Sequence, residues 1–164
     1  GAGTVATRLA KIVGATVFTT VGSEEKVEKA KLFADYVFNH YSDDVPSLVK
    51  EATGGRGVEV VLDYVGSATW KRSLECLAVG GRMITFGGLS GYRGEIDIRG
   101  FYTKHLTLIG TYGGTKIDLF KVLAFVEKGL LRPIIDSVYP LKDARIAHIK
   151  MEENRHFGKI LLKP

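Results

Sequence analysis

The stretch that decides the fold is residues 4–39, TVATRLAKIVGATVFTTVGSEEKVEKAKLFADYVFN. Apolar residues recur at helical spacing over residues 4–13, which predicts a helix. The run TVFTTV at residues 16–21 is rich in β-branched residues, which favours a strand. Ser23 is then a good N-cap for a second helix, and residues 36–39 follow as a short strand. Helices and strands therefore alternate from the start of the chain.

The same alternation continues through the middle of the sequence. Further helices are expected from Asp43 or Asp44 to about residue 53, over 67–78 with Ser67 as the cap, and over 116–128. Further strands are expected over 58–63, over 82–86 after a Gly80-Gly81 turn, and over 106–111. Strands separated by helices of about ten residues indicate βαβ units. The sequence thus predicts the α/β class, with a doubly wound parallel sheet of the Rossmann type.

The pattern changes after Gly129. A strand is predicted over residues 134–139, a helix over 142–154 and a short strand over 159–162. This last part is too short to form a hydrophobic core of its own. We therefore expect residues 1–130 to form one domain and residues 131–164 to form a C-terminal segment that packs elsewhere.

Composition and charge exclude several classes of protein. The 164 residues carry 23 basic and 18 acidic side chains, and the basic ones show no aromatic interleaving of the kind found in single-strand nucleic-acid binders. Cys76 is the only cysteine, which excludes an intrachain disulfide framework and fits a reducing compartment such as the cytoplasm. No apolar run approaches the ~20 residues of a membrane span. We expect a cytoplasmic protein that binds a small anionic ligand, with no nucleic-acid or membrane partner.

The start of the chain and the first strand suggest what that ligand is. Gly1 and Gly3 lead directly into a helix, where small residues let a pyrophosphate approach the helix N-terminus. In NAD-preferring domains, the second strand of the Rossmann fold ends in an acid. The strand over residues 16–21 corresponds to that strand, but Val21-Gly22-Ser23 at its end contains no acid. Ser23 and Lys26 suit the 2′-phosphate of NADP instead.

Other residues that could carry chemistry give weaker signals. Asp63 ends a strand and is interpreted as a turn or capping carboxylate, and Trp70 as a packing residue. The histidines show no ligand spacing with the cysteine, so no metal site is predicted. No Ser/His/Asp or Cys/His arrangement stands out, and the catalytic residues stay unassigned.

Taken together, the motifs resemble the cofactor-binding half of the medium-chain dehydrogenase/reductase superfamily, and most of all its quinone oxidoreductases. The segments that carry the resemblance are GAGTVATRLAKIVGATV, VGSEEK, LFADYVFNHYSDD, TGGRGVEVVLDYVG, LAVGGRMITFGGLSG, LTLIGTY, YPLKDARIAH and HFGKILLKP. The resemblance implies that the Rossmann sheet is incomplete, because its first strand and an upstream catalytic domain are absent. Residues 131–164 would return to that domain, and the chain alone would be inactive.

The resemblance also assigns a cofactor site, with residues 1–130 as an NADP(H)-binding domain. Its members are grouped by the part of the cofactor they would meet: Gly1 and Gly3 at the pyrophosphate; Gly22, Ser23, Lys26 and either His40 or Tyr41 at the 2′-phosphate; Val65 and Gly66 beside the cofactor; and Phe86, Gly87, Leu89 and Ser90 at the nicotinamide.

The function implied is the nucleotide-binding part of an NADP(H)-dependent oxidoreductase that transfers hydride to a quinone, carbonyl or activated alkene. A zinc-dependent alcohol dehydrogenase of the same superfamily is the alternative. More distant alternatives are an S-adenosylmethionine-dependent methyltransferase and a non-enzymatic nucleotide-binding module. The apolar strand from Leu106 to Thr111 is expected at a sheet edge, where relatives pair across a two-fold axis, and predicts a homodimer.

Overall fold

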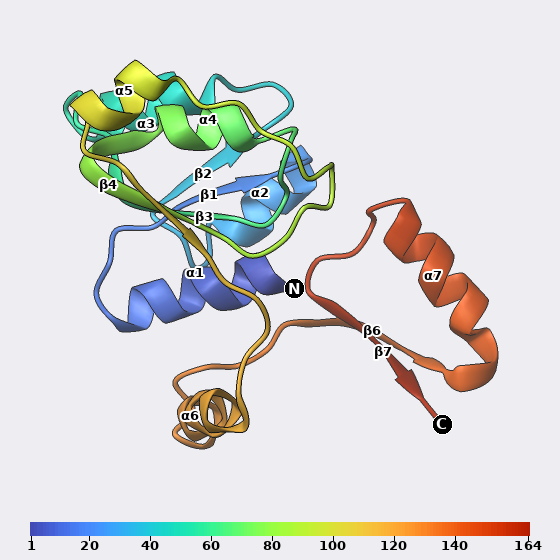
Figure 1. Cartoon of the computed structure of the whole chain (residues 1–164). Helices are drawn as coiled ribbons and strands as arrows, with labels where there is room; N and C mark the ends of the chain where they lie inside the picture. Colours follow the sequence, from blue (N-terminus) through green and yellow to red (C-terminus); the bar gives the residue numbers. More distant parts are fainter. The chain divides into compact units, whose positions relative to one another are not determined.

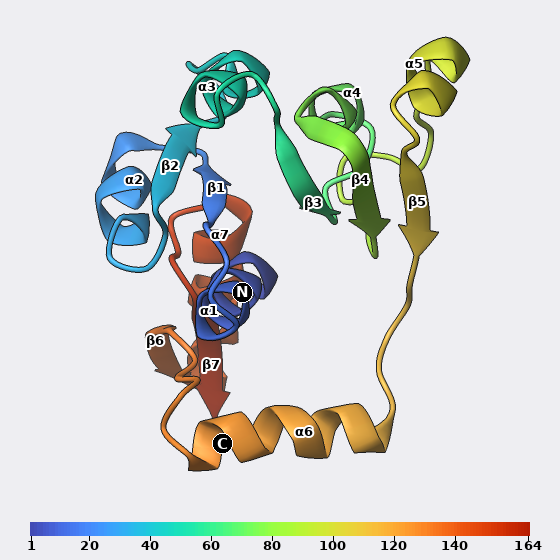
Figure 2. The same ribbon diagram turned by 90° about the vertical axis from the view of Figure 1, so that its left-hand side faces the viewer.

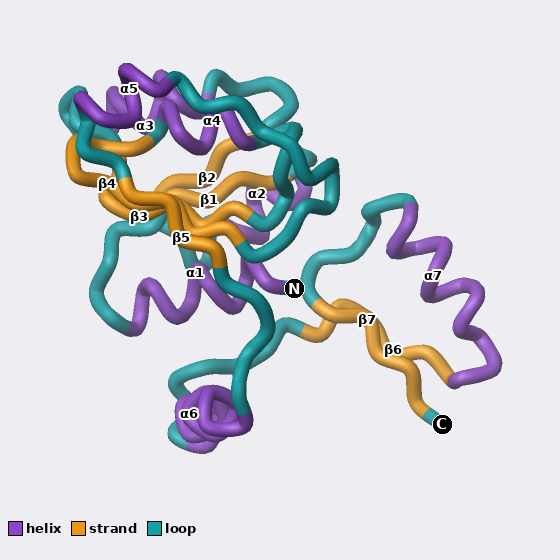
Figure 3. The backbone as a smooth tube through the Cα atoms, in the orientation of Figure 1, coloured by secondary structure: helices purple, strands orange, loops and turns teal.

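The computed structural model describes residues 1–164, and it divides the chain into two compact units. The first unit combines Gly1–Asn39 with Lys116–Pro164, and the second is His40–Thr115. Helices and strands alternate along the chain (Figure 3). Every paired strand runs parallel to its neighbour. The predicted α/β class is therefore confirmed. The predicted domain boundary after residue 130 is a different kind of division from these two compact units, and it stays a prediction.

The first unit holds two small parallel sheets. Its elements are α1 (Ala2–Ile12), β1 (Phe18–Val21), α2 (Glu24–Ala30), β2 (Tyr36–Asn39), α6 (Lys116–Glu127), β6 (Ile135–Pro140), a 3₁₀ turn (Leu141–Asp143), α7 (Ala144–Glu152) and β7 (Lys159–Lys163). β1 pairs with β2, and α2 lies against both strands (Figure 2). β6 pairs with β7, with α7 as the connection between them (Figure 1). Buried apolar residues of this unit include Val17, Val27, Ala30, Leu131 and Ala147.

The second unit is a three-stranded sheet with helices. Its elements are α3 (Val45–Ala52), β3 (Val58–Asp63), α4 (Trp70–Glu75), β4 (Leu77–Thr85), α5 (Ile98–Thr103) and β5 (Thr107–Gly110). The strand order is β3-β4-β5, so β5 lies at the edge of this sheet, as predicted (Figure 2). The core includes Val49, Leu77 and Met83, the last of which has no exposed surface.

Three elements of the second unit differ from the sequence predictions. The helix expected over 67–78 is confined to α4, because Ser67 is held in a turn: its hydroxyl donates to the Arg93 carbonyl (2.6 Å). β4 begins at Leu77 rather than at residue 82, since Leu77 already pairs with Val58 of β3; the register then shifts, and regular pairing resumes with Arg82 opposite Val60. Helix α5 was not predicted; the Asp97 side chain caps it by accepting from the Arg99 N–H (3.1 Å).

A partly buried ion pair stabilises the βαβ segment of the first unit. The Asp136 carboxylate accepts from Lys150 Nζ, from the Ser137 hydroxyl (2.9 Å) and from the Phe157 N–H (2.8 Å). The side chains of Asp136 and Lys150 are only 12% and 23% exposed. Burial alone would raise the pKa of Asp136, but these hydrogen bonds outweigh it and lower that pKa to about 2.

Asp136→Asn is therefore expected to lower the free energy of unfolding by about 2–3 kcal/mol at neutral pH, because it removes the negative charge that faces the Lys150 ammonium in a partly buried pair. Since the pKa of Asp136 is depressed on folding, this stabilisation is present above the usual value of 3.8 and is lost as the pH falls through about 2. Urea unfolding across pH 2–7 checks this prediction. A variant whose deficit is the same at pH 2 as at pH 7 would contradict it.

None of the helices is long and apolar enough to cross a membrane.

Candidate functional site

The N-terminus of α1 is suited to an anion. Gly1 is the N-cap residue, and its carbonyl accepts from the Thr4 hydroxyl (2.9 Å) and the Val5 N–H (3.3 Å). The first turn, which includes Gly3, contains no acidic residue. A side chain at Gly1 would meet nothing within 4 Å, so the approach to the first N–H groups is open. These groups and the helix dipole favour a phosphate here.

The end of β1 leads directly into the start of α2. Gly22 follows the strand, and Ser23 is the N-cap of α2, with its hydroxyl oxygen accepting from the Lys26 N–H (3.4 Å). The predicted cap is thus confirmed. No acid occupies the strand end or the cap position, whereas Lys26 lies on the first turn of the helix. The Ser23 hydroxyl keeps its own proton to donate.

Lys26 is held by a residue that the sequence analysis did not identify. Its ammonium donates to the Asn154 carbonyl and to Asn154 Oδ1 (3.1 Å), across 128 positions of sequence. Asn154 has a φ of 54°, in the left-handed region. Burial lowers the pKa of Lys26, an effect that Glu25 partly offsets. Two of the three ammonium donors are thereby used, and the third is available for a ligand.

The segment from Asn154 to Gly158 links the two parts of the site in the first unit. Asn154 accepts from Lys26 at the start of α2, and the Gly158 carbonyl accepts from the Gly1 nitrogen at the start of α1 (3.3 Å). Between them the ring of Phe157 packs on Phe33, with ring centroids 5.9 Å apart. The starts of α1 and α2, predicted to bind the pyrophosphate and the 2′-phosphate, are therefore joined by one short stretch of backbone.

Two carboxylates follow Ser23, and each has a partner. Glu24 Oε1 accepts from Asn39 Nδ2 at 2.7 Å, at the end of β2. Glu25 pairs with Lys29 one turn further along α2 (2.5 Å), and this ion pair lowers the pKa of Glu25. These are the only acids in the first turn of the helix. Both carboxylates are therefore held by residues of the same unit.

In the second unit, Asp63 organises the loop after β3. It is 3% exposed, and its carboxylate accepts from the N–H groups of Val65 and Gly66 (both 2.9 Å) and from the hydroxyls of Thr69 and Ser73 (2.7 and 2.6 Å). Every bond goes to its own loop or to the helix that follows. Asp63 is therefore the turn carboxylate that the sequence predicted.

The loops after β3 and β4 are joined to each other. The Val65 carbonyl accepts from both the N–H and the hydroxyl of Ser90 (2.8 Å each). Gly87 lies against the Tyr64 carbonyl, and the rings of Tyr64 and Phe86 are 5.4 Å apart. The structure thus brings together Val65, Gly66, Phe86, Gly87 and Ser90. Leu89 lies in the same loop but is 81% exposed.

Gly66 is the point at which these loops meet most closely. Its φ is +91°, and a Cβ there would overlap the Gly91 carbonyl oxygen and lie 2.9 Å from Gly88 Cα. Gly66→Ala is expected to destabilise the unit by about 2–5 kcal/mol, because backbone strain and overlap add. Gly80→Ala is the control: φ is +74° but nothing lies within 4 Å, so only about 1 kcal/mol is expected. Chemical denaturation of both variants checks this, and equal losses would contradict the role of the close contact.

His40 and Tyr41 form the remaining predicted pair. Their rings are 4.4 Å apart. Arg72, on α4, donates to the His40 carbonyl (2.8 Å) and to the Ala68 carbonyl (3.3 Å), so α4 fixes the backbone of this corner. Arg72 carries no motif, and the sequence analysis did not single it out.

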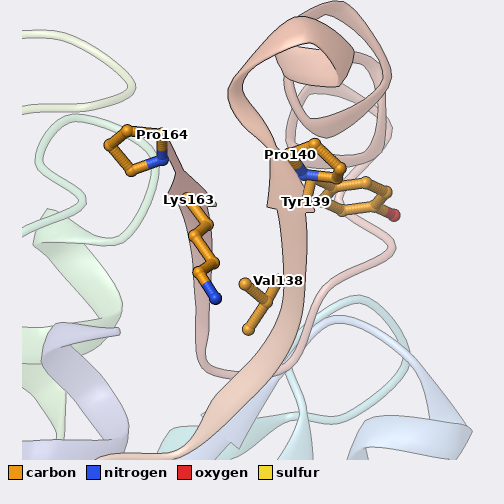
Figure 4. Close-up of a pocket in the computed structure, with 5 residues that line it drawn as sticks. All are labelled: Val138, Tyr139, Pro140, Lys163 and Pro164. Carbon is orange, nitrogen blue, oxygen red and sulfur yellow. The ribbon is translucent and has the colours of Figure 1, made fainter.

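Three other features lie apart from these residues. A cavity of about 280 Å³ at the ends of β6 and β7 is lined by Val138, Tyr139, Pro140, Lys163 and Pro164, none of them a predicted site residue (Figure 4). Burial raises the pKa of the Cys76 thiol to about 11, so this cysteine stays protonated at neutral pH. Trp70 donates to the Glu95 carbonyl (3.1 Å) and packs on Gly94. No group of three or more His, Cys, Asp or Glu side chains is gathered to hold a metal ion.

The fold and these loops define a nucleotide-binding unit of the Rossmann kind, and the comparisons assign it to a family. The family model described as zinc-binding dehydrogenase matches residues 1–128. The chain belongs to this family, within the medium-chain dehydrogenase/reductase superfamily, as its sequence motifs predicted.

Particular relatives are similar over the whole chain. Quinone oxidoreductase 1 of Escherichia coli (strain K12) is 36% identical over 177 residues, covering 100% of this chain and 54% of the relative. The crystal structure of Escherichia coli quinone oxidoreductase complexed with NADPH matches with a TM-score of 0.84 at 34% identity, over 100% of this chain and 54% of that one. The crystal structure of an NAD-dependent alcohol dehydrogenase matches with a TM-score of 0.89 at 37% identity, over 97% of this chain and 47% of that one. The chain thus spans about half the length of these relatives.

Proposed function

We propose that this chain is the nucleotide-binding part of an NADP(H)-dependent oxidoreductase that transfers hydride to a quinone, a carbonyl or an activated alkene. The observation that carries the proposal is the start of α2, where Ser23 and Lys26 follow a strand end without an acid. A related structure of the same coverage, Escherichia coli quinone oxidoreductase, was solved with NADPH, which supports the choice of cofactor.

The residues of the first unit fit the phosphates of this cofactor. The open start of α1 at Gly1 and Gly3 would hold the pyrophosphate through N–H groups. Gly22, the Ser23 hydroxyl and the third donor of Lys26 would hold the 2′-phosphate. His40 or Tyr41 is proposed as a further ligand of this phosphate.

The joined loops of the second unit fit the other end of the cofactor. Val65 and Gly66 would pass beside it, and Phe86, Gly87, Leu89 and Ser90 would meet the nicotinamide, mainly through backbone groups. The bound cofactor supplies the hydride, and the protein holds and orients it. The tight contact at Gly66, which packs the two loops against each other, supports this assignment. No residue of this chain is assigned as the proton donor.

A zinc-dependent alcohol dehydrogenase is the second candidate. The similarity to an NAD-dependent alcohol dehydrogenase, at 37% identity, favours it. The strand end without an acid argues for NADPH rather than NADH and therefore for the first candidate. None of the residues described here is assigned to a metal.

Calorimetric titration of the chain with NADPH, NADH and S-adenosylmethionine separates these functions. We expect the tightest binding with NADPH, weaker binding with NADH and none with S-adenosylmethionine, and no quinone-dependent oxidation of NADPH by the chain alone. Equal dissociation constants for NADPH and NADH would refute the cofactor choice. Binding of S-adenosylmethionine alone would point to a methyltransferase.

Two further properties are proposed together with this function. The open edge of β5 would pair with the same strand of a second copy, which gives a homodimer. The lone Cys76, a buried thiol, supports a reducing compartment, the cytoplasm.

A further inference from the structure

Glu24 is a carboxylate placed where it could decide the cofactor. It follows Ser23 directly, as the first residue of α2, and its side chain is exposed. Glu24 is the direct neighbour of Ser23 in the chain, and a glutamate side chain is long and flexible enough to take more than one direction from there. An acid in such a place accepts hydrogen bonds from ribose hydroxyls and repels a 2′-phosphate.

Asn39 holds this carboxylate. It is the last residue of β2, and its Cα is the register partner of Val21 at the end of β1. From there its side-chain amide donates to Glu24 Oε1 at 2.7 Å, a charge-assisted hydrogen bond between the strand end and the helix start. The carboxylate is thus fixed toward the end of β2. Glu25 is fixed differently, by Lys29 on the same helix.

We propose that Asn39 is a specificity-determining residue, which holds the Glu24 carboxylate at the end of β2 and so keeps it from turning to the 2′-position of the adenosine ribose. With Glu24 held, Ser23 and Lys26 present a hydroxyl and an ammonium to a phosphate. With Glu24 released, the same corner presents a carboxylate to a pair of ribose hydroxyls. The proposal rests on the proposed function, because it concerns the choice between NADPH and NADH.

A double-mutant cycle on the chain tests it, with the ratio of the NADH and NADPH dissociation constants as the readout. Asn39→Ala is expected to lower that ratio by about tenfold, since a freed carboxylate repels the phosphate. Glu24→Gln is expected to leave the ratio at or above that of the unmodified chain. In the Glu24→Gln background, Asn39→Ala is expected to change nothing, because there is no charge left to hold. Glu28→Gln, the same change of charge one turn further along α2, where Glu28 pairs with Lys31, is the matched control and should leave the ratio as it is.

Asn39→Leu keeps the size of the side chain while removing the amide donor and adding no charge, and it is expected to lower the ratio about as much as alanine does. It covers the case in which the alanine variant folds poorly, which circular dichroism and thermal unfolding would reveal. An unchanged ratio in both Asn39 variants would overturn the proposal. The proposal would also be overturned if Asn39→Ala lowered the ratio of dissociation constants equally in the unmodified chain and in the Glu24→Gln background. Failure of the unmodified chain to bind NADPH would instead overturn the proposed function itself.

Discussion

Lys26→Ala is expected to weaken NADPH binding by about tenfold to a hundredfold and to leave NADH binding nearly unchanged. The ammonium of Lys26 has one donor beyond the two that Asn154 accepts. A hydrogen bond to a charged group contributes about 1.5–3 kcal/mol, which corresponds to this range in Kd. NADH lacks the 2′-phosphate and should not sense the change. Calorimetric titration of the variant with both cofactors measures it.

Two control variants separate the phosphate contact from other effects of the substitution. Lys31→Ala removes the same charge at the other end of α2, where Lys31 pairs with Glu28, and should alter neither affinity. Asn154→Ala removes the side-chain acceptor of Lys26 but keeps the backbone carbonyl acceptor and the ammonium, so NADPH should still bind more tightly than NADH. A loss of the same size for both cofactors in Lys26→Ala would mean that Lys26 supports the fold rather than the phosphate.

Gly110→Pro is expected to convert a dimer of this chain into a monomer. The Thr111 N–H donates to the Thr85 carbonyl of β4 (3.0 Å), and backbone groups alternate along a strand. The N–H of Ile109 therefore also faces β4, whereas those of Leu108 and Gly110 face the open edge of the sheet. Proline at position 110 removes an outward donor and leaves the ladder with β4 intact. Proline at Ile109 would break that inner ladder instead.

Light scattering at tens of micromolar chain measures the oligomeric state of the unmodified chain and of Gly110→Pro, with Gly110→Ala as the control. A Cβ at Gly110 meets nothing within 4 Å, so the alanine variant should fold and dimerise like the unmodified chain. The exposed Ile109, at 39%, would be covered in the dimer. If the unmodified chain is a monomer, or if Gly110→Pro remains a dimer, pairing through β5 is wrong.

Elements with a complete local signal were predictable from the sequence. The β-branched run before Gly22 forms β1, Ser23 caps α2, and Gly129, with a φ of 69°, follows the end of α6. Asp63 ends a strand and binds the turn after it, as a carboxylate in that place does. In each case the interacting groups lie within a few residues of one another, so neighbouring letters contain the information. The cofactor-binding roles of the predicted site residues stay predictions.

Tertiary structure alone decided the features that depend on distant residues. Ser67 is a good cap by sequence, yet it binds Arg93 in the next loop, and α4 starts only at Trp70. Sequence motifs assign Lys26 to the 2′-phosphate, but nothing near it in the chain points to Asn154, which holds it from 128 residues away. Glu24 and Asn39 meet because two parallel strands end side by side, which no local pattern records. Propensity and capping act over one turn of chain, whereas the register of a sheet and the return of a distant segment depend on packing that only the folded chain provides.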